Sequence, residues 1–140
     1  LASSAASDVY KRQELPEFLS KLKQTVTELA RVGVQPVLMT LPPIDGARYL
    51  DYICRGGLSR DSIMRWLGDV GCIYRYQELY SDTVASFAMR EGLPLIDVRR
   101  RFLPQRDLSE LISADGIHLT MPGYRQLFDT LAQWVVPQLA

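Results

Sequence analysis

The chain has 140 residues, 47% of them hydrophobic, which suits a single domain with a packed core. Its 16 basic and 16 acidic side chains give a formal net charge of zero, so charge favours neither a nucleic acid nor an anionic membrane as a partner. The longest apolar runs fall far short of the ~20 residues that a membrane-spanning helix needs, so no membrane span is predicted.

The first 13 residues differ in character from the rest. Residues 3–13 read SSAASDVYKRQ, and this string resembles, at every position, the in-frame translation of a transposase-based sequencing adapter. We therefore expect residues 1–13 to be a non-native tail that takes no part in the fold. A natural Ser/Ala-rich linker is the alternative. On the first hypothesis native sequence begins near Glu14, inside a longer gene, and the cellular location, cytoplasmic or secreted, stays open.

A helix and then a strand are predicted next. Over residues 14–32 apolar side chains recur at the spacing of an amphipathic helix, with Pro16 in its first turn and Gly33 at its end. Its predicted buried face consists of Leu15, Phe18, Leu19, Leu22, Val26 and Leu29. The run Val34–Leu41 predicts a strand buried on both faces, as in a parallel sheet covered by helices. Pro36 counts against a central position because it cannot donate to a neighbouring strand.

A second helix and strand follow a turn at 42–46. The aromatic-rich segment 47–80 predicts a loop with short helices, one of them over about 59–67. A longer helix over about 74–90 is predicted to end at Gly92 and to direct four side chains inward: Leu79, Val84, Phe87 and Ala88. Residues 94–98 then predict a second short buried strand.

The C-terminal part predicts short helical turns and a last helix. The basic run Arg99–Arg101 is interpreted as a solvated helix start rather than a phosphate site, and a helical turn is expected over 108–112. The final helix is predicted over about 122–139, with Thr120 as its N-cap. Alternating helices and strands are typical of a parallel α/β sheet. Two strands are few for such a sheet, so further strands are expected to precede this sequence.

The cysteines do not predict a metal site. Cys54 and Cys72 have neither Cys-x-x-Cys nor zinc-ribbon spacing, and the chain has a single histidine to add as a ligand. The sequence leaves open whether the two thiols are free or form a disulfide.

The segment Asp115-Gly-Ile-His118 is the strongest candidate for chemistry. An imidazole can take a proton from a hydroxyl nucleophile and return it to a leaving group, provided that a carboxylate fixes its tautomer. A three-residue separation across a glycine turn can bring Asp115 beneath Nδ1 of His118, leaving Nε2 without a protein partner. A purely structural turn is the alternative, because Asp-Gly is a common turn dipeptide.

The span from Glu14 resembles the second half of SGNH/GDSL-type serine ester hydrolases. The resemblance depends on the Pro-rich loop LPPI (41–44) after a strand, on a later strand that ends in Asp97, and on Asp115-Gly-Ile-His118 before a Gly-Tyr helix. It implies a flavodoxin-like three-layer α/β/α fold with a parallel sheet whose N-terminal strands are missing. Residues 14–140 would then be the C-terminal portion of a single domain.

The resemblance also implies an activity. His118 would be the general base and Asp115 its orienting carboxylate, acting without cofactor or metal on a small-molecule ester such as an acylated carbohydrate or a lipid. The family's Gly-Asp-Ser block, which supplies the nucleophile, has no counterpart here, nor has the glycine or the Gly-x-Asn-Asp block of the oxyanion hole. The chain alone is therefore predicted to be inactive.

Two questions stay open at this level. Pro43, Ile44, Tyr49 and Tyr52 are predicted to line the substrate pocket, because their loop leaves a strand end that faces the catalytic pair and amphipathic rings suit glycan contact. The alternative is that the aromatic rings only pack beneath a long loop. Likewise, a non-catalytic α/β binding module with a structural Asp-Gly-Ile-His turn is the alternative to a hydrolase. No oligomeric state is indicated.

Overall fold

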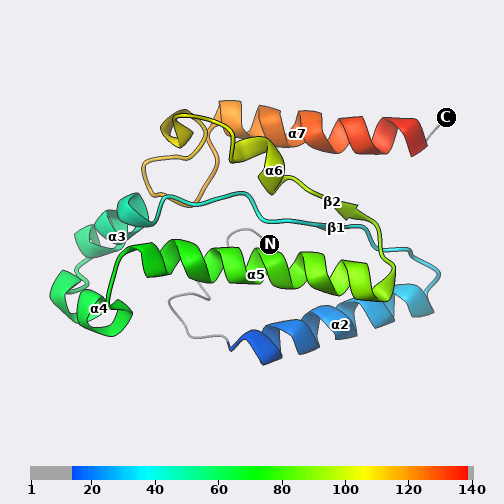
Figure 1. The fold of residues 1–140 in the computed structure, drawn as a ribbon, viewed down its shortest axis with the longest axis horizontal. Helices are drawn as coiled ribbons and strands as arrows, with labels where there is room; N and C mark the ends of the chain where they lie inside the picture. Colours follow the sequence, from blue (N-terminus) through cyan, green and yellow to red (C-terminus); the bar gives the residue numbers. More distant parts are fainter. Residues whose placement is uncertain (1–13, 139–140) are drawn as a thin grey trace.

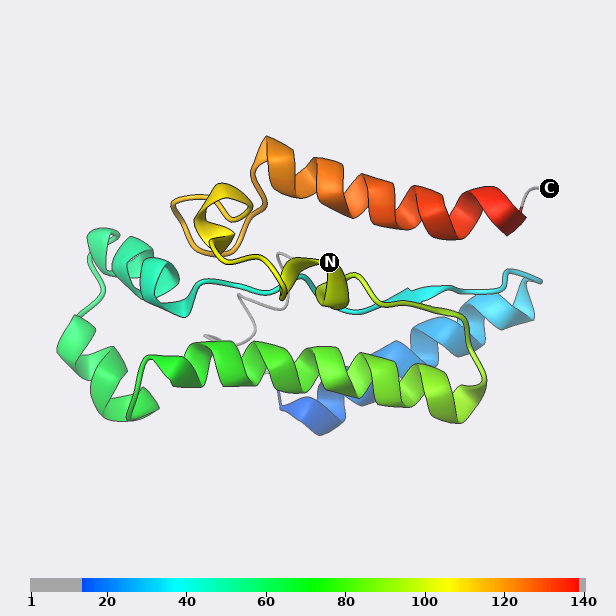
Figure 2. The same ribbon diagram turned by 45° about the horizontal axis from the view of Figure 1, so that its top comes forward.

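Helices and a two-stranded sheet form three layers in the computed structural model, which describes residues 14–138 (Figure 1). The elements in chain order are α2 (Leu15–Arg31), β1 (Leu38–Met39), α3 (Gly46–Arg55), α4 (Arg60–Leu67), α5 (Gly71–Glu91), β2 (Leu95–Ile96), α6 (Arg99–Phe102), the 3-10 turn η1 (Leu108–Glu110), α7 (Met121–Val135) and the 3-10 turn η2 (Val136–Gln138). Helix α7 covers one face of the sheet and α5, with α2 outside it, covers the other (Figures 1 and 2). The tail predicted for residues 1–13 lies outside the described residues.

The two strands are parallel, as predicted, but much shorter than the sequence suggests. Leu38 pairs with Leu95, and the amide of Thr40 donates to the carbonyl oxygen of Ile96 at 3.1 Å. The prediction of a strand over 34–41 buried on both faces is wrong, because Val34 and Val37 are 48% and 40% exposed. Within residues 14–138 β1 has one neighbouring strand, so no second strand is hydrogen-bonded to its other edge.

Helix α2 confirms the predicted helix, although its apolar stripe is only half-buried. The six side chains predicted to face inward are all of intermediate exposure, and none is fully buried. The reason is that α2 packs mainly on α5. The rings of Phe18 and Tyr80 meet edge to face, with centroids 4.9 Å apart, at this helix–helix contact. Gly33, with φ +76°, follows the end of the helix.

Helix α5 is the central support of the fold. Its buried residues follow three- and four-residue spacing: Ile73, Gln77, Tyr80, Ser81, Val84, Phe87 and Ala88. Three of the four predicted inward side chains are therefore confirmed. Leu79 is the exception, since it lies off this stripe and is exposed, while the neighbouring Tyr80 takes the inward position. Gly92 ends the helix in the left-handed conformation, as predicted.

The aromatic segment forms helices more fully than predicted. Most of residues 47–58 lie in a regular helix, α3. Its N-cap Asp45 accepts a hydrogen bond from the amide of Arg48. Helix α4 matches the helix predicted over 59–67. Ile44 and Leu50 form a core cluster with Ile73 of α5, and a second cluster lies beneath α7. The first cluster lies between α3 and α5, and the second lies between the sheet and α7.

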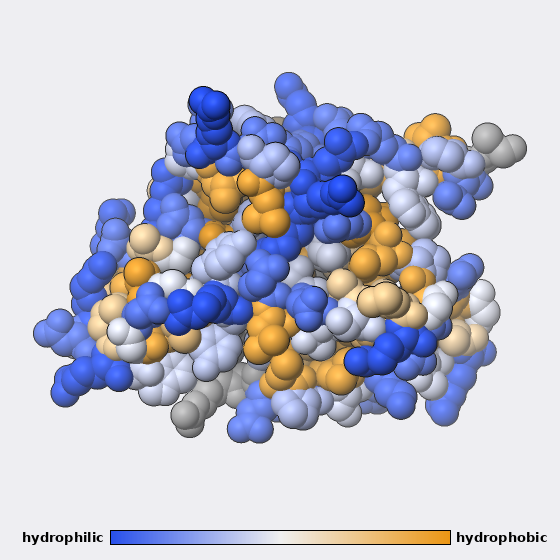
Figure 3. Space-filling view, viewed as in Figure 1, coloured by the Kyte–Doolittle hydropathy of each residue, from blue (hydrophilic) through white to orange (hydrophobic). Residues whose placement is uncertain are grey.

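The surface is mixed in character. On the face seen in Figure 3, hydrophobic areas are interrupted by hydrophilic side chains and do not form one continuous surface. No helix in the described part of the chain is long and apolar enough to cross a membrane.

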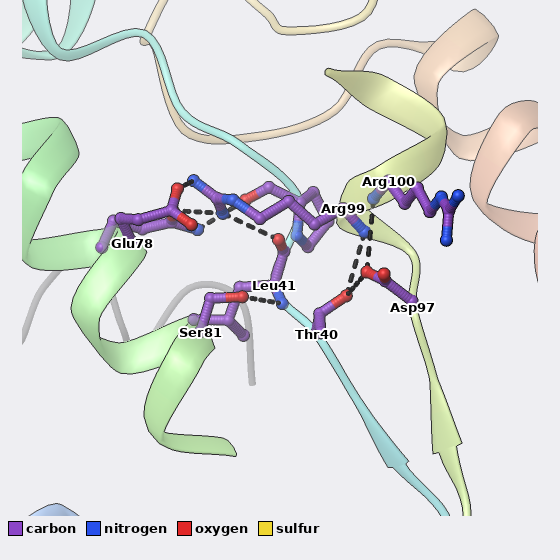
Figure 4. A network of polar contacts seen from close by, with 9 residues as sticks. Thr40, Leu41, Glu78, Ser81, Asp97, Arg99 and Arg100 are labelled. Atoms are coloured by element: carbon purple, nitrogen blue, oxygen red, sulfur yellow. Dashed lines mark hydrogen bonds and ion pairs between the residues drawn. The ribbon is translucent and has the colours of Figure 1, made fainter. Parts of the chain in front are cut away.

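Arg99 is buried, so the interpretation of Arg99–Arg101 as a solvated helix start is wrong for its first residue. Its Nη1 donates to the carbonyl oxygen of Leu41 at 3.0 Å and to Oε1 of Gln77 at 2.7 Å (Figure 4). Nη2 forms an ion pair with Oε2 of Glu78 at 2.5 Å, and Nε has no hydrogen-bond partner among residues 14–138. The guanidinium also lies over the ring of Tyr74, 5.2 Å from its centroid.

We predict that Arg99→Met lowers the free energy of unfolding by roughly 2–4 kcal/mol, because it leaves buried carbonyl and amide oxygens without a donor. The exposed neighbour provides a matched control, since the side chain of Arg100 points away from the network (Figure 4). Arg100→Met should change stability by no more than about 0.5 kcal/mol. Urea denaturation followed by circular dichroism measures both. Equal effects of the two substitutions would contradict a structural role for Arg99.

Candidate functional site

The Asp115–His118 segment forms a closed loop between η1 and α7. The amide of Ser113 donates to the carbonyl oxygen of His118 at 2.8 Å, and Ile112 and Leu119 form an antiparallel bridge beside it. Thr120 then caps α7, as predicted, by accepting a hydrogen bond from the amide of Gly123. The loop is therefore fixed at both ends by backbone hydrogen bonds.

Gly116 docks this loop onto the start of α3. Its φ is +81°, and its carbonyl oxygen accepts from the amide of Asp45 at 2.8 Å. A Cβ atom at this position would lie 2.4 Å from both the carbonyl oxygen of Asp45 and the amide nitrogen of Tyr49. Only glycine permits this approach, and the approach places His118 beside the segment that leads from β1 into α3.

Asp115 and His118 meet as the sequence predicts. Nδ1 of His118 lies 2.5 Å from Oδ2 of Asp115. The other carboxylate oxygen, Oδ1, accepts hydrogen bonds from the Ser113 hydroxyl at 2.5 Å and from the amides of Ile117 and His118 at 3.0 Å each. Within residues 14–138, Nε2 makes no hydrogen bond, and the side chain of His118 is 51% exposed. The predicted geometry is thus confirmed; its role is a separate question.

The surroundings of Asp115 keep it ionised. Partial burial by itself raises the pKa of this carboxyl, but the hydrogen bonds from Ser113, His118 and two backbone amides outweigh burial and hold the pKa well below its usual value. An ionised carboxylate only accepts hydrogen bonds, so Nδ1 must carry the proton in this contact. In neutral His118 the lone pair is then on Nε2, the other nitrogen of this half-exposed side chain. This is the arrangement that a general base requires.

A cavity of about 70 Å³ lies next to the imidazole. His118 and Ile44 both line it, together with Leu41, Leu119 and other apolar side chains. The structure therefore brings one of the four predicted substrate-pocket residues, Ile44, into the same cavity as His118.

The other three predicted pocket residues lie elsewhere. Pro43 is fully buried, and Tyr49 is a core residue at the contact between α3 and α5. Tyr52 is exposed on α3. None of the three lines the cavity beside His118. For Tyr49 this arrangement matches the alternative in which aromatic rings pack beneath the loop.

Sequence reasoning missed several residues that build the site. Ser113 holds the carboxylate, and Gln77 and Tyr124 line the cavity. A Ser-x-Asp turn is a local signal that could indicate the first of these, since hydroxyl and carboxylate are close in sequence. Gln77 has no such signal, because it reaches the cavity only through the packing of α5 against the strand ends. Cys54 and Cys72 are both free thiols.

No protein-family model matches the chain, and no curated protein matches it. The part of the chain that the structure describes has no group of three or more His, Cys, Asp or Glu side chains placed to hold a metal ion. The geometry of Asp115, His118 and the adjoining cavity therefore determines which chemistry can be proposed for the site.

We predict that Gly116→Ala destabilises the protein by more than about 3 kcal/mol and displaces the His118 loop. Gly33→Ala is the matched control, because Gly33 has a similar φ of +76° but nothing within 4 Å of the added Cβ. The control should cost only the roughly 1–2 kcal/mol of left-handed strain. Denaturation curves and amide chemical shifts of the loop measure both effects. Similar losses for the two variants would contradict the close docking of Gly116.

We predict that Asp115→Asn lowers stability at neutral pH by about 1–3 kcal/mol and flattens its dependence on acid pH. A depressed folded-state pKa contributes stability that is present above the unfolded value, about 4, and is lost as the pH falls towards the folded value. Wild type and variant should therefore converge on acidification. Asp82→Asn, at an exposed position on α5, is the control and should change neither. Urea midpoints between pH 2.5 and 7 test this, and parallel profiles would oppose it.

Proposed function

We propose that His118 and Asp115 are the general base and the orienting carboxylate of a serine ester hydrolase of SGNH/GDSL type, acting on a small-molecule ester. One observation carries the proposal: Nδ1 of His118 is bound to an ionised carboxylate, while Nε2 of this half-exposed side chain has no hydrogen-bond partner among residues 14–138 and the ring lines an apolar cavity. A structural histidine with a buried ring would instead have both ring nitrogens satisfied within the protein.

The chemistry follows from the orientation of the imidazole. Nε2 accepts the proton of a serine hydroxyl as its oxygen attacks the ester carbonyl, and the imidazolium that forms is stabilised by Asp115. The same proton then passes from Nε2 to the departing alcohol, which leaves an acyl-serine. Water repeats the two steps, with Nε2 as its base, and releases the carboxylic acid.

The nucleophile in this proposal comes from outside the 140 residues. The hydroxyl of Ser113 donates to Asp115, and Ser81 accepts from the amide of Leu41, so both are engaged elsewhere. None of the other described serines is hydrogen-bonded to His118. The resemblance of the terminal block to SGNH/GDSL hydrolases supports a Gly-Asp-Ser turn in preceding sequence as the source.

The proposal, which keeps the expectation that residues 1–13 are a non-native tail, is tested by joining residues 14–140 to the coding sequence that precedes them in the source gene. The extended protein should hydrolyse p-nitrophenyl acetate, and the 140-residue chain should not, because an Asp–His pair without a nucleophile and oxyanion donors lacks the main steps. Asp115→Asn should reduce turnover on the order of 10⁴-fold. Asp82→Asn is the control and should leave turnover unchanged.

Two results would overturn the hydrolase. One is preceding sequence without a Gly-Asp-Ser turn, and the other is activity that survives His118→Ala. Either result favours the alternative, a non-catalytic α/β binding module in which the Asp115–His118 turn has a structural role.

A further inference from the structure

The cavity beside His118 is small and mainly apolar. Its volume is about 70 Å³, and most of its lining comes from aliphatic side chains, among them Met39, Ile44, Leu119 and Leu127. Gln77 is one of the few polar residues in the lining, and its amide is already engaged, donating to Pro42 and accepting from Arg99. A ligand that fills the cavity would therefore meet mainly hydrocarbon, together with the imidazole of His118 and the side chain of Tyr124.

One wall of the cavity is held rigidly. Leu41 and Pro42 line it, and three side chains hold their backbone, two of them, Ser81 and Arg99, at Leu41 (Figure 4). The amide of Leu41 donates to the hydroxyl of Ser81 at 3.1 Å, and its carbonyl oxygen accepts from Arg99 at 3.0 Å. The carbonyl oxygen of Pro42 accepts from Gln77 at 2.5 Å. Because Arg99 and Gln77 are themselves buried, this wall cannot move outward without breaking buried hydrogen bonds.

We propose that this cavity is a short-acyl pocket, which accepts the acyl group of an acetyl or propionyl ester. The inference rests on the proposed hydrolase function and adds the substrate class. The cavity's 70 Å³ is about half the volume of an apolar cavity that accommodates benzene, about 150 Å³, so a group of only a few heavy atoms fits. Because this wall is held by hydrogen bonds, the small volume limits the length of the acyl chain that can fit.

The cavity itself is tested on the 140-residue chain with xenon, which enters dry apolar cavities. Under xenon pressure the methyl resonances of Ile44, Leu119 and Leu127 should shift, and those of Leu22 on the distant helix α2 should not. Leu127→Ala should enlarge the cavity enough to bind benzene, whereas the matched Leu22→Ala should not. The xenon measurement on the wild-type chain does not depend on whether any variant folds. Absence of a xenon response at the cavity methyls would overturn the inference whatever the catalytic result.

The acyl assignment is tested on the extended, active protein. The value of kcat/KM should fall by at least about tenfold from p-nitrophenyl acetate to the hexanoate, and Leu127→Ala should shift the preference to longer chains. A hydrolase that binds xenon but prefers hexanoate would refute the short-acyl pocket and leave the hydrolase proposal intact. Xenon binding without any hydrolysis would refute both together.

Discussion

The positions of the strand ends depend on the hydrogen bonds of the buried guanidinium of Arg99. Strands of two residues form few ladder hydrogen bonds, so the ladder alone cannot fix how the chain leaves them. Just beyond the ladder, Thr40 donates to Asp97 and accepts from the amide of Arg99, which ties the carboxyl ends of β1 and β2 together. The side chain of Arg99 then joins both ends to α5. Open parallel sheets build their sites at this edge, so a polar network here acts directly on the site.

The site has two supports that meet at α3. The first is the backbone from Leu41 to Ile44, held by α5 and by Arg99. The second is the glycine turn of the His118 loop, which docks on the N-terminus of the same helix through Asp45 and Gly116. Arg48 reinforces this contact by donating to the carbonyl oxygen of Ile112 at 3.0 Å. A continuous path of buried or backbone contacts therefore connects Arg99 with the imidazole, although the two residues are far apart in the sequence.

Features that depend on neighbours in sequence could be predicted, and features that depend on distant partners could not. Periodicity and capping located α2 and α7, and a three-residue spacing across Gly116 brought Asp115 to His118. Arg99 was mistaken for a surface residue because its partners, Gln77 and Leu41, come from other elements. The extent of β1 depends on what pairs with its second edge, which its apolar pattern does not reveal. Two parallel strands between helices are an α/β arrangement; the flavodoxin-like sheet stays a prediction.

The two carboxylate oxygens of Asp115 bind different partners. Oδ1 accepts three hydrogen bonds, from a hydroxyl and two amides, and these fix the carboxylate within its own loop. Oδ2 is left for the imidazole alone among the described residues. Because these three hydrogen bonds do not involve the imidazole ring, the carboxylate keeps its position whether or not the ring carries a second proton. The Ser113 hydroxyl therefore adds no charge to the pair, but its hydrogen bond helps to hold the carboxylate beside the imidazole.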